Sequence, residues 1–446
     1  MSKLENKLKK IIETFNNVNR EIAFKDIKKL SEKYNRNISI QNVLFQIAKK
    51  VGDIDTSINA LKKILNVEND NTLYLSQLYK LLLRKSHFDE ALEKINTILE
   101  IDHKNYEALR DRSYIYFLQN NYIEAKKCIE SISDLKDDDY FGYNLKGLIF
   151  LKNNFFEEAR NSFKKSLKIN DQYIDGYNNL GACLLELEKL DDAKKVFINA
   201  YKIDKKNVST LINLANVLSL QDDVVGAVRY YNEALNLEPN NQEILSNLAI
   251  CYCRESKEKE AKIFYDKALK INPNDYKLIY AYCTLQLKLN NFDQSWDLFD
   301  SRLLIEKNKN KLNNFDLIKN NLFNNLKINP KDKLLVLREQ GIGEEILFSS
   351  IYSEIIDKFE NIKIEADKRL VSIFNRSFGK NIFVEDGYYS KKSKVSSFDK
   401  ITYAGSLIKF FRKKNRNHSS IIVFAINKLG LFSSFFRRIS AVCFAS

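Results

Sequence analysis

Apolar positions through roughly the first three hundred residues recur at helical spacing, and the whole pattern repeats every 34 residues. Polar runs such as Asn120-Asn121 separate the apolar stretches, as short exposed turns require. The pattern predicts nine pairs of antiparallel helices: two degenerate pairs over residues 1–71 and a regular array over residues 72–305. One position of every pair carries a small residue: Ala23, Ser57, Ala91, Ala125, Ala159, Ala193, Ala227, Ala261 and Ser295.

Large side chains keep the same register as the small ones. Phe197, Tyr231 and Tyr265 recur in the second helix of each pair, and Gly181 occupies a small-residue position in a first helix. Antiparallel helices approach closely where one offers Gly, Ala or Ser and a large ring fills the space beside the contact. This pattern resembles the small–large signature of the tetratricopeptide repeat (TPR) family, most clearly over residues 145–273. The resemblance implies a mainly α fold, a right-handed α-solenoid superhelix.

Three asparagines recur at the period of the array: Asn179, Asn213 and Asn247. In a TPR superhelix their position faces the inner groove, where an amide side chain can donate to and accept from a peptide backbone. They resemble the asparagine ladder of the O-linked N-acetylglucosamine transferase array, which implies a protein or peptide ligand. Asparagine is also common at this position in TPRs of every kind, so a purely structural role remains the alternative.

The pattern changes after residue 332. Residues 306–332 are rich in Asn and Lys and predict a connector, and beyond them short apolar runs of strand length alternate with helical spacing. Such alternation predicts a small α/β domain with a parallel sheet. The strands are expected at 334–337, 362–365, 381–384 and 399–404, and the helices at 344–359, 369–378 and 407–412.

A second resemblance begins after the first of these strands. The segment containing Glu339, Gln340, Gly341, Gly343 and Glu344 resembles the E-Q-G-x-G-[DE] motif of a glycosyltransferase-like domain found behind TPR arrays in many bacterial proteins. Segments 296–302 and 398–412 resemble further parts of the same architecture. The resemblance implies a Rossmann-like half of a two-lobed, B-type glycosyltransferase over residues 333–415.

The chemistry of this motif stays open. Two glycines after a strand permit a tight turn, but carboxylates in the first turn of the following helix would repel a phosphate. Glu344 therefore either positions a sugar hydroxyl or simply starts the helix, and Glu339 is a weak candidate for a general base. The donor-binding second lobe would need well over ~100 further residues, and about thirty remain after residue 415.

Two functions follow from these patterns. The first is a scaffold that binds an extended peptide or partner protein in the TPR groove and carries an inactive, truncated lobe. The alternative is a glycosyltransferase that moves a sugar from a nucleotide sugar to a protein or glycan.

The distribution of charge along the chain indicates which classes of partner are favoured. Of the net charge of +14, residues 306–446 carry +12 (26 Lys and Arg minus 14 Asp and Glu), so the array is nearly neutral and nucleic acid is not favoured as a partner. Residues 416–446 form a basic, apolar tail of the kind that a truncation or shifted reading frame leaves. Its composition is compatible with disorder or with contact to an anionic membrane.

The cysteine and histidine residues do not occur at the spacings typical of metal ligands, so the sequence predicts neither a metal site nor a cofactor. The six cysteines are interpreted as buried small hydrophobes in a reducing compartment. The charged first ten residues do not resemble a secretory signal, and a cytoplasmic protein is expected.

Overall fold

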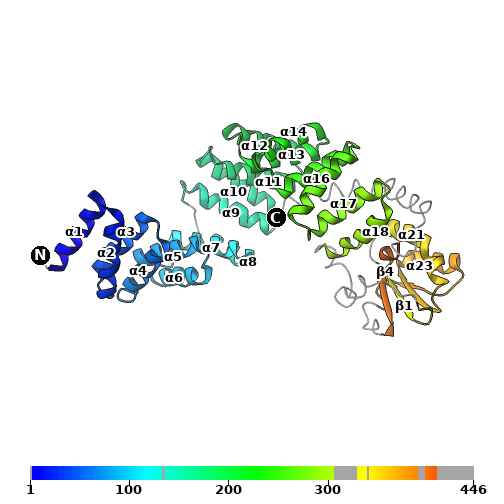
Figure 1. The fold of residues 1–446 in the computed structure, drawn as a ribbon, viewed down its shortest axis with the longest axis horizontal. Helices are drawn as coiled ribbons and strands as arrows, with labels where there is room; N and C mark the ends of the chain where they lie inside the picture. The colour runs from blue at the N-terminus through cyan, green and yellow to red at the C-terminus, as the bar shows by residue number, and fades with distance from the viewer. Residues whose placement is uncertain (1–2, 133–135, 306–328, 339–340, 390–396, 409–446) are drawn as a thin grey trace. The chain divides into compact units, whose positions relative to one another are not determined.

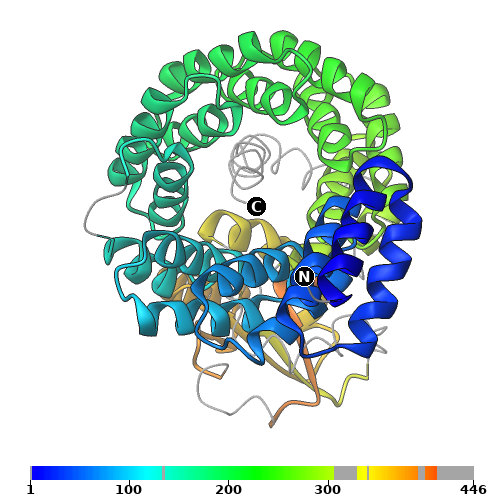
Figure 2. The same ribbon diagram turned by 90° about the vertical axis from the view of Figure 1, so that its left-hand side faces the viewer.

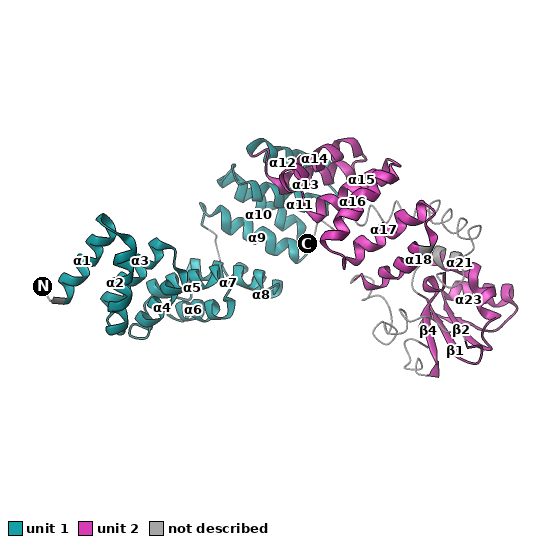
Figure 3. Cartoon of the chain, in the orientation of Figure 1, with its two compact units in different colours: residues 1–203 teal, residues 204–446 magenta. Residues whose placement is uncertain are grey.

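The computed structural model describes residues 3–132, 136–305, 329–338, 341–389 and 397–408. The polypeptide divides into two compact units, residues 1–203 and residues 204–446 (Figure 3). Within the described residues, unit 1 is helical and unit 2 combines helices with a sheet.

Unit 1 consists of helices that pack in consecutive antiparallel pairs, coloured from blue through cyan to green in Figure 1. The first two pairs fill the region where the repeat pattern is weakest. The described helices are α1 (Lys3–Asn17), α2 (Arg20–Lys33), α3 (Ile38–Val51), α4 (Ile54–Leu65), α5 (Thr72–Arg84), α6 (Phe88–Ile101), α7 (Tyr106–Leu118), α8 (Tyr122–Glu130), α9 (Tyr140–Lys152), α10 (Phe156–Ile169), α11 (Ile174–Glu186) and α12 (Leu190–Ile203).

Unit 2 continues with further helical pairs and ends in a small α/β part. Its helices from α13 to α17 form two layers, visible as the green to yellow-green arc in Figure 2. They are α13 (Val208–Leu220), α14 (Val224–Leu237), α15 (Gln242–Arg254), α16 (Glu258–Ile271), α17 (Tyr276–Lys288) and α18 (Phe292–Phe299), followed by the 3-10 helix η1 (Asp300–Leu304).

The small residues predicted to hold each pair together are buried. All nine positions from Ala23 to Ser295 are at most 1% exposed. Gly181 on α11 lies directly against the ring of Phe197 on α12, and Gly147 on α9 lies in the same way against Phe163 on α10. Close approach of paired helices therefore depends on these small–large contacts, as the sequence predicted.

The turn inside every described pair except α1–α2 contains one residue in the left-handed backbone region, with φ between 57° and 84°. Left-handed backbone is costly for side chains other than Gly, Asn and Asp, yet only some of these positions carry such residues. The turn geometry is therefore set by the helical pair and not by one residue type. The eight positions repeat at the period of the array: Gly52, Ser86, Asn120, Asn154, Glu188, Asp222, Ser256 and Asn290.

The α/β part of unit 2 contains a four-stranded, wholly parallel sheet in the order β3-β2-β1-β4, which confirms the predicted parallel arrangement. Its central strand β1 is buried at every position after the first. The described elements are β1 (Lys333–Leu337), α21 (Ile342–Phe348), η2 (Ser349–Ile351), α22 (Tyr352–Ile356), β2 (Asn361–Ala366), α23 (Lys368–Phe378), β3 (Phe383–Glu385), β4 (Lys400–Tyr403) and η4 (Ala404–Leu407).

The prediction of one continuous helix in the α/β part is wrong. The segment expected to run from 344 to 359 is divided into α21, the 3-10 turn η2 and α22. The hydroxyl of Ser349 donates to the carbonyl oxygen of Ile346 at 2.7 Å, and serine competes in this way with regular helical bonding. The predicted connector is undescribed from residue 306 to residue 328, and the tail over residues 416–446 lies wholly outside the described residues.

A single hydrophobic core joins the last helical pair to the sheet. Trp296 and Phe299 of α18 belong to the same buried cluster as Leu334 of β1 and Ile364 of β2. Beside this cluster the guanidinium of Arg302, 1% exposed, donates to Asp300 at 3.0 Å and to the Ser406 hydroxyl at 3.3 Å. The Ser406 hydroxyl in turn donates to Asp300 at 2.7 Å. Within unit 2, the helical pairs and the sheet are therefore continuous.

Candidate functional site

Side-chain amides link neighbouring first helices in both units. In unit 1, Asn179 on α11 donates from Nδ2 to Oδ1 of Asn144 on α9 at 3.0 Å, and Asn144 donates to the Tyr173 hydroxyl at 3.3 Å. In unit 2, Asn247 on α15 donates to Oδ1 of Asn216 on α13 at 3.4 Å. Two of the three predicted asparagines thus join one first helix to the one before it.

The third predicted asparagine, Asn213, is half-buried on α13. Asn179 is likewise half-buried, whereas Asn247 is 6% exposed. An amide side chain has one acceptor oxygen and two N–H donors. Asn179 uses one N–H for the hydrogen bond to the neighbouring helix, so its other N–H and its oxygen can bind a ligand. The structural role that the sequence left open is therefore present, and it is compatible with ligand contact.

An ion-pair network that the sequence analysis missed lies on the first helices of unit 1. Arg110 on α7 donates from Nε to Asp111 at 2.9 Å and from a terminal nitrogen to Asp139, the N-cap of α9, at 3.0 Å. The Tyr79 hydroxyl donates to Asp111 at 3.0 Å, and the Tyr106 hydroxyl donates to Asp139 at 2.6 Å. Arg110 is therefore fixed from two sides and cannot change rotamer without breaking several charge-assisted bonds.

The environment of Asp139 favours its charged form. Burial by itself raises the pKa of this carboxyl, but hydrogen bonds from Tyr106, from the Gly142 backbone N–H and from Arg110 outweigh burial, and the pKa is lowered. Burial and the same hydrogen bond raise the pKa of the Tyr106 hydroxyl above its usual range, so tyrosine remains the donor. Asp139 is consequently charged at neutral pH, and the Tyr106 hydroxyl keeps its proton.

Aromatic rings surround Arg110 on the same helices. Its guanidinium lies 5.7 Å from the ring centre of Phe141 and 5.9 Å from that of Tyr106. Phe141 on α9 packs edge-to-face against Tyr114 on α7 at 5.7 Å, and both rings are half-buried. We call Tyr106, Arg110, Tyr114, Phe141, Asn144 and Asn179 the first-helix face of unit 1. Rigid aromatic rings and arginine are the residues that dominate binding energy at protein interfaces.

The motif that resembles a glycosyltransferase is only partly described. Glu339 and Gln340 lie outside the described residues. Gly341 is exposed and its carbonyl oxygen accepts the first backbone hydrogen bond of α21, from Glu345 at 3.0 Å. Glu344 lies in the first turn of that helix, as the sequence predicted, whereas Gly343, predicted to belong to the preceding turn, is already helical because α21 begins at Ile342. The motif therefore begins at the carboxyl end of β1.

Charged residues gather at this carboxyl edge of the sheet. Arg338, which follows β1, donates to Glu345 of α21 at 2.7 Å and forms ion pairs with Asp367 at 3.2 Å and Asp386 at 3.3 Å, which follow β2 and β3. Glu345 is 2% exposed, and this burial raises the pKa of its carboxyl despite the bond from Arg338. Ligands of open parallel sheets bind outside the carboxyl ends of the strands, so this edge is a second candidate site.

Metal binding has no support within the described ranges, where no group of three His, Cys, Asp or Glu side chains is placed to hold an ion. Among the described residues, no helix has both the length and the apolar character needed to cross a membrane. Of the described cysteines, Cys128, Cys183, Cys251 and Cys283 are buried and Cys253 is half-buried.

The repeated pairs, with their buried small residues and linked first helices, define an α-solenoid. Residues 142–173, 174–207 and 242–275 match the family model of the tetratricopeptide repeat. These three segments of the chain are therefore tetratricopeptide repeats, recognisable by sequence. No curated protein matches the chain.

Several solved structures resemble part of the chain. A tetratricopeptide repeat protein from Parabacteroides merdae is 14% identical with a TM-score of 0.45, covering 58% of this chain and 98% of its own. The C-terminal part of a TPR protein from Cytophaga hutchinsonii is 16% identical with a TM-score of 0.42, covering 53% and 96%. YrrB, described as a TPR protein with an unusual peptide-binding site, is 16% identical with a TM-score of 0.35, covering 42% and 96%.

Proposed function

We propose that the protein is a protein-interaction scaffold whose first-helix face binds an extended peptide or a segment of a partner protein. The observation that carries this proposal is the fixed Arg110 between Asp111 and Asp139, beside the half-exposed rings of Tyr114 and Phe141. Because these side chains are already ordered, a ligand loses little free energy in immobilising them. Asn179 supplies an amide for the ligand backbone at the next first helix.

The test is selection of binding peptides from a random displayed library, followed by calorimetric titration of the enriched peptides into variants. We expect Phe141→Ala and Tyr114→Ala each to weaken binding by roughly tenfold or more, as for interface hot spots. Lys195→Ala is the matched control, since Lys195 is an exposed residue of the second helix α12. Enriched peptides that bind the aromatic variants as tightly as the parent protein would exclude this face.

A second candidate function is sugar transfer at the carboxyl edge of the sheet. It is favoured by the position of Arg338 and its carboxylate partners where β1, β2 and β3 end, the location at which open parallel sheets bind ligands. In this proposal the α/β part is a glycosyltransferase-like lobe, and a nucleotide sugar is the donor. Incubation with labelled nucleotide sugars would show hydrolysis or transfer, lost in Glu339→Ala. If no nucleotide sugar binds, only the scaffold function remains.

A further inference from the structure

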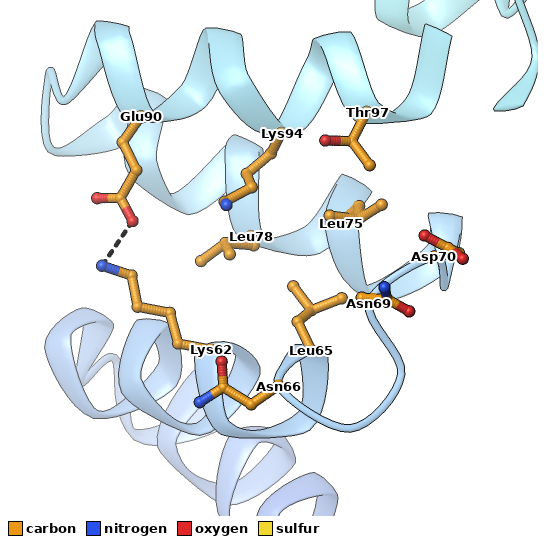
Figure 4. A pocket seen from close by; sticks show the side chains of 10 residues that line it. All are labelled: Lys62, Leu65, Asn66, Asn69, Asp70, Leu75, Leu78, Glu90, Lys94 and Thr97. Atoms are coloured by element: carbon orange, nitrogen blue, oxygen red, sulfur yellow. Dashed lines mark ion pairs between the residues drawn. The ribbon is translucent and has the colours of Figure 1, made fainter. Parts of the chain in front are cut away.

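A groove lies between α4 and α6, the second helices of two consecutive pairs in unit 1. Residues of α4, α5 and α6 and of the α4–α5 loop enclose a volume of about 460 Å³ (Figure 4). Small-molecule sites in proteins commonly occupy ~300–1,000 Å³. The groove is therefore large enough for a small ligand.

The groove lies where α4 ends early. This helix has 12 residues and α6, on the other side of the groove, has 14; of the other described second helices, α2, α10, α12, α14 and α16 have 14, α8 has 9 and α18 has 8. Asn66 consequently leaves the helix as its C-cap, and a longer loop leads to α5. α4 is thus about half a turn shorter than α6. This is a local departure from the repeat, which no periodic pattern reveals.

The groove has an apolar floor and a cationic side chain above it. Leu75 and Leu78 of α5, at most 2% exposed, form the floor, and the half-buried Leu65 of α4 supplies the apolar surface that a ligand can still cover. Lys94 reaches from α6 toward Leu78 in Figure 4, and its side chain is 23% exposed. Its ammonium pairs with Glu93 at 2.8 Å, but Glu93 is 67% exposed, and such surface pairs are worth little in water. Lys94 can therefore exchange this partner for a ligand at small cost.

One end of the groove is closed by a second ion pair. Lys62 of α4 and Glu90 of α6 are 2.6 Å apart and connect the two helices (Figure 4). Asp70 lines the groove within the α4–α5 loop. Because Lys62 neutralises Glu90, Lys94 and Asp70 are the remaining charges of the lining, and Asp70 would repel a second negative charge on a ligand that approaches Lys94. The lining therefore favours a monoanion over a dianion.

We propose that this groove binds a monocarboxylate with a short branched aliphatic body. The aliphatic part packs against Leu65, and the carboxylate accepts a charge-assisted hydrogen bond from Nζ of Lys94. Asn66 and Thr97 line the same space with further donors. Such a carboxylate belongs either to a free small acid or to the C-terminal leucine of a peptide.

The two sources are separated by two probes, 4-methylpentanoate and N-acetyl-glycyl-leucine, titrated into the whole protein and followed by amide chemical shifts of α4 and α6. The matched controls are 4-methylpentanamide and the leucinamide form of the peptide, which keep the aliphatic body and lack the charge. We expect one or both acids to bind at least about fivefold more tightly than their amides. Binding of the free acid alone identifies a small-molecule site, and binding of the peptide alone identifies a site for the carboxyl terminus of a polypeptide.

Two variants locate the site. Lys94→Gln should weaken binding of the acid by about fivefold or more while leaving that of the amide unchanged, because only the charged bond is removed. Thr97→Trp should abolish binding of both by filling the groove from α6. Lys195→Gln, an exposed lysine of α12, should change neither. Circular dichroism verifies that each variant is folded. Any of three results overturns the proposal. These are equal affinities for acid and amide, unchanged affinity of the folded Lys94→Gln variant for the acid, and no binding of either acid.

Discussion

The contact between Gly181 and Phe197 permits a quantitative test of the small–large packing. A Cβ added to Gly181 would lie 2.2 Å from Cε1 and 2.4 Å from Cζ of the ring, whereas carbon atoms are in favourable contact at about 3.5–4.0 Å. The ring must therefore move by more than ~1 Å, although Phe197 is completely buried. Overpacking of this kind costs about 1–3 kcal/mol.

Helix propensity acts in the opposite direction. Replacing an interior glycine by alanine favours a helix by about 1 kcal/mol. Gly181→Ala should therefore change the free energy of unfolding by only about 0–2 kcal/mol, destabilising. The free energy of unfolding of this single variant therefore cannot separate the steric clash with Phe197 from the gain in helix propensity.

A double-mutant cycle isolates the clash. In a Phe197→Leu background the ring is absent, so Gly181→Ala should stabilise by about 1 kcal/mol, and the two effects of the same substitution should differ by about 1–3 kcal/mol. Urea unfolding followed by circular dichroism, with hydrogen exchange of α11 amides, gives the four free energies. A coupling below ~0.5 kcal/mol would refute the packing argument, because independent sites add within that margin. Gly147 and Phe163 offer an independent repetition, with a closest distance of 2.5 Å.

Three further predictions concern other parts of the array. Glu188→Gly should stabilise by about 0.5–1 kcal/mol in thermal unfolding because it relieves a left-handed turn, whereas Asn120→Gly should be close to neutral; equal gains would contradict the conformational explanation. Asp139→Asn should destabilise by about 2 kcal/mol at neutral pH. Since the folded pKa of Asp139 is lowered, the difference should shrink as pH falls below ~4, and a constant difference in acid unfolding curves would count against the network. Burial raises the pKa of the Cys183 and Cys251 thiols to about 11, so both should resist a thiol reagent at pH ~8 until the protein is unfolded; rapid native labelling of either, measured by mass spectrometry, would disagree with their placement.

The sequence predicts the helical pairs well because each pair repeats the same physical requirement. Small residues such as Ala193 and rings such as Phe197 recur at a fixed interval, and the parallel sheet is visible in its apolar runs. The left-handed turn recurs as faithfully in the structure, but residues as different as Ser86 and Glu188 occupy it. No single residue type marks that position, so the sequence signal is weak.

A periodic sequence pattern does not predict structural features that occur only once. Arg110 contacts Asp139 across two helices, and the equivalent positions in the following repeats are Asn144 and Asn178, so repetition does not identify the ion pair. The groove lies where α4 ends early, and helix ends are the least certain part of any sequence-based prediction. Glu339, the candidate base, lies outside the described residues and stays a prediction.

The shared core at the end of unit 2 limits where the protein can be divided for experiments. Trp296 and Phe299 complete the hydrophobic surroundings of β1, and Arg302 is buried against Ser406. A recombinant fragment that starts inside residues 306–332 would leave apolar strand residues bare to water and would lack Asp300, the acceptor for the Ser406 hydroxyl. Expression of the α/β part on its own should therefore begin no later than Tyr276, so that α17 and α18 accompany the sheet.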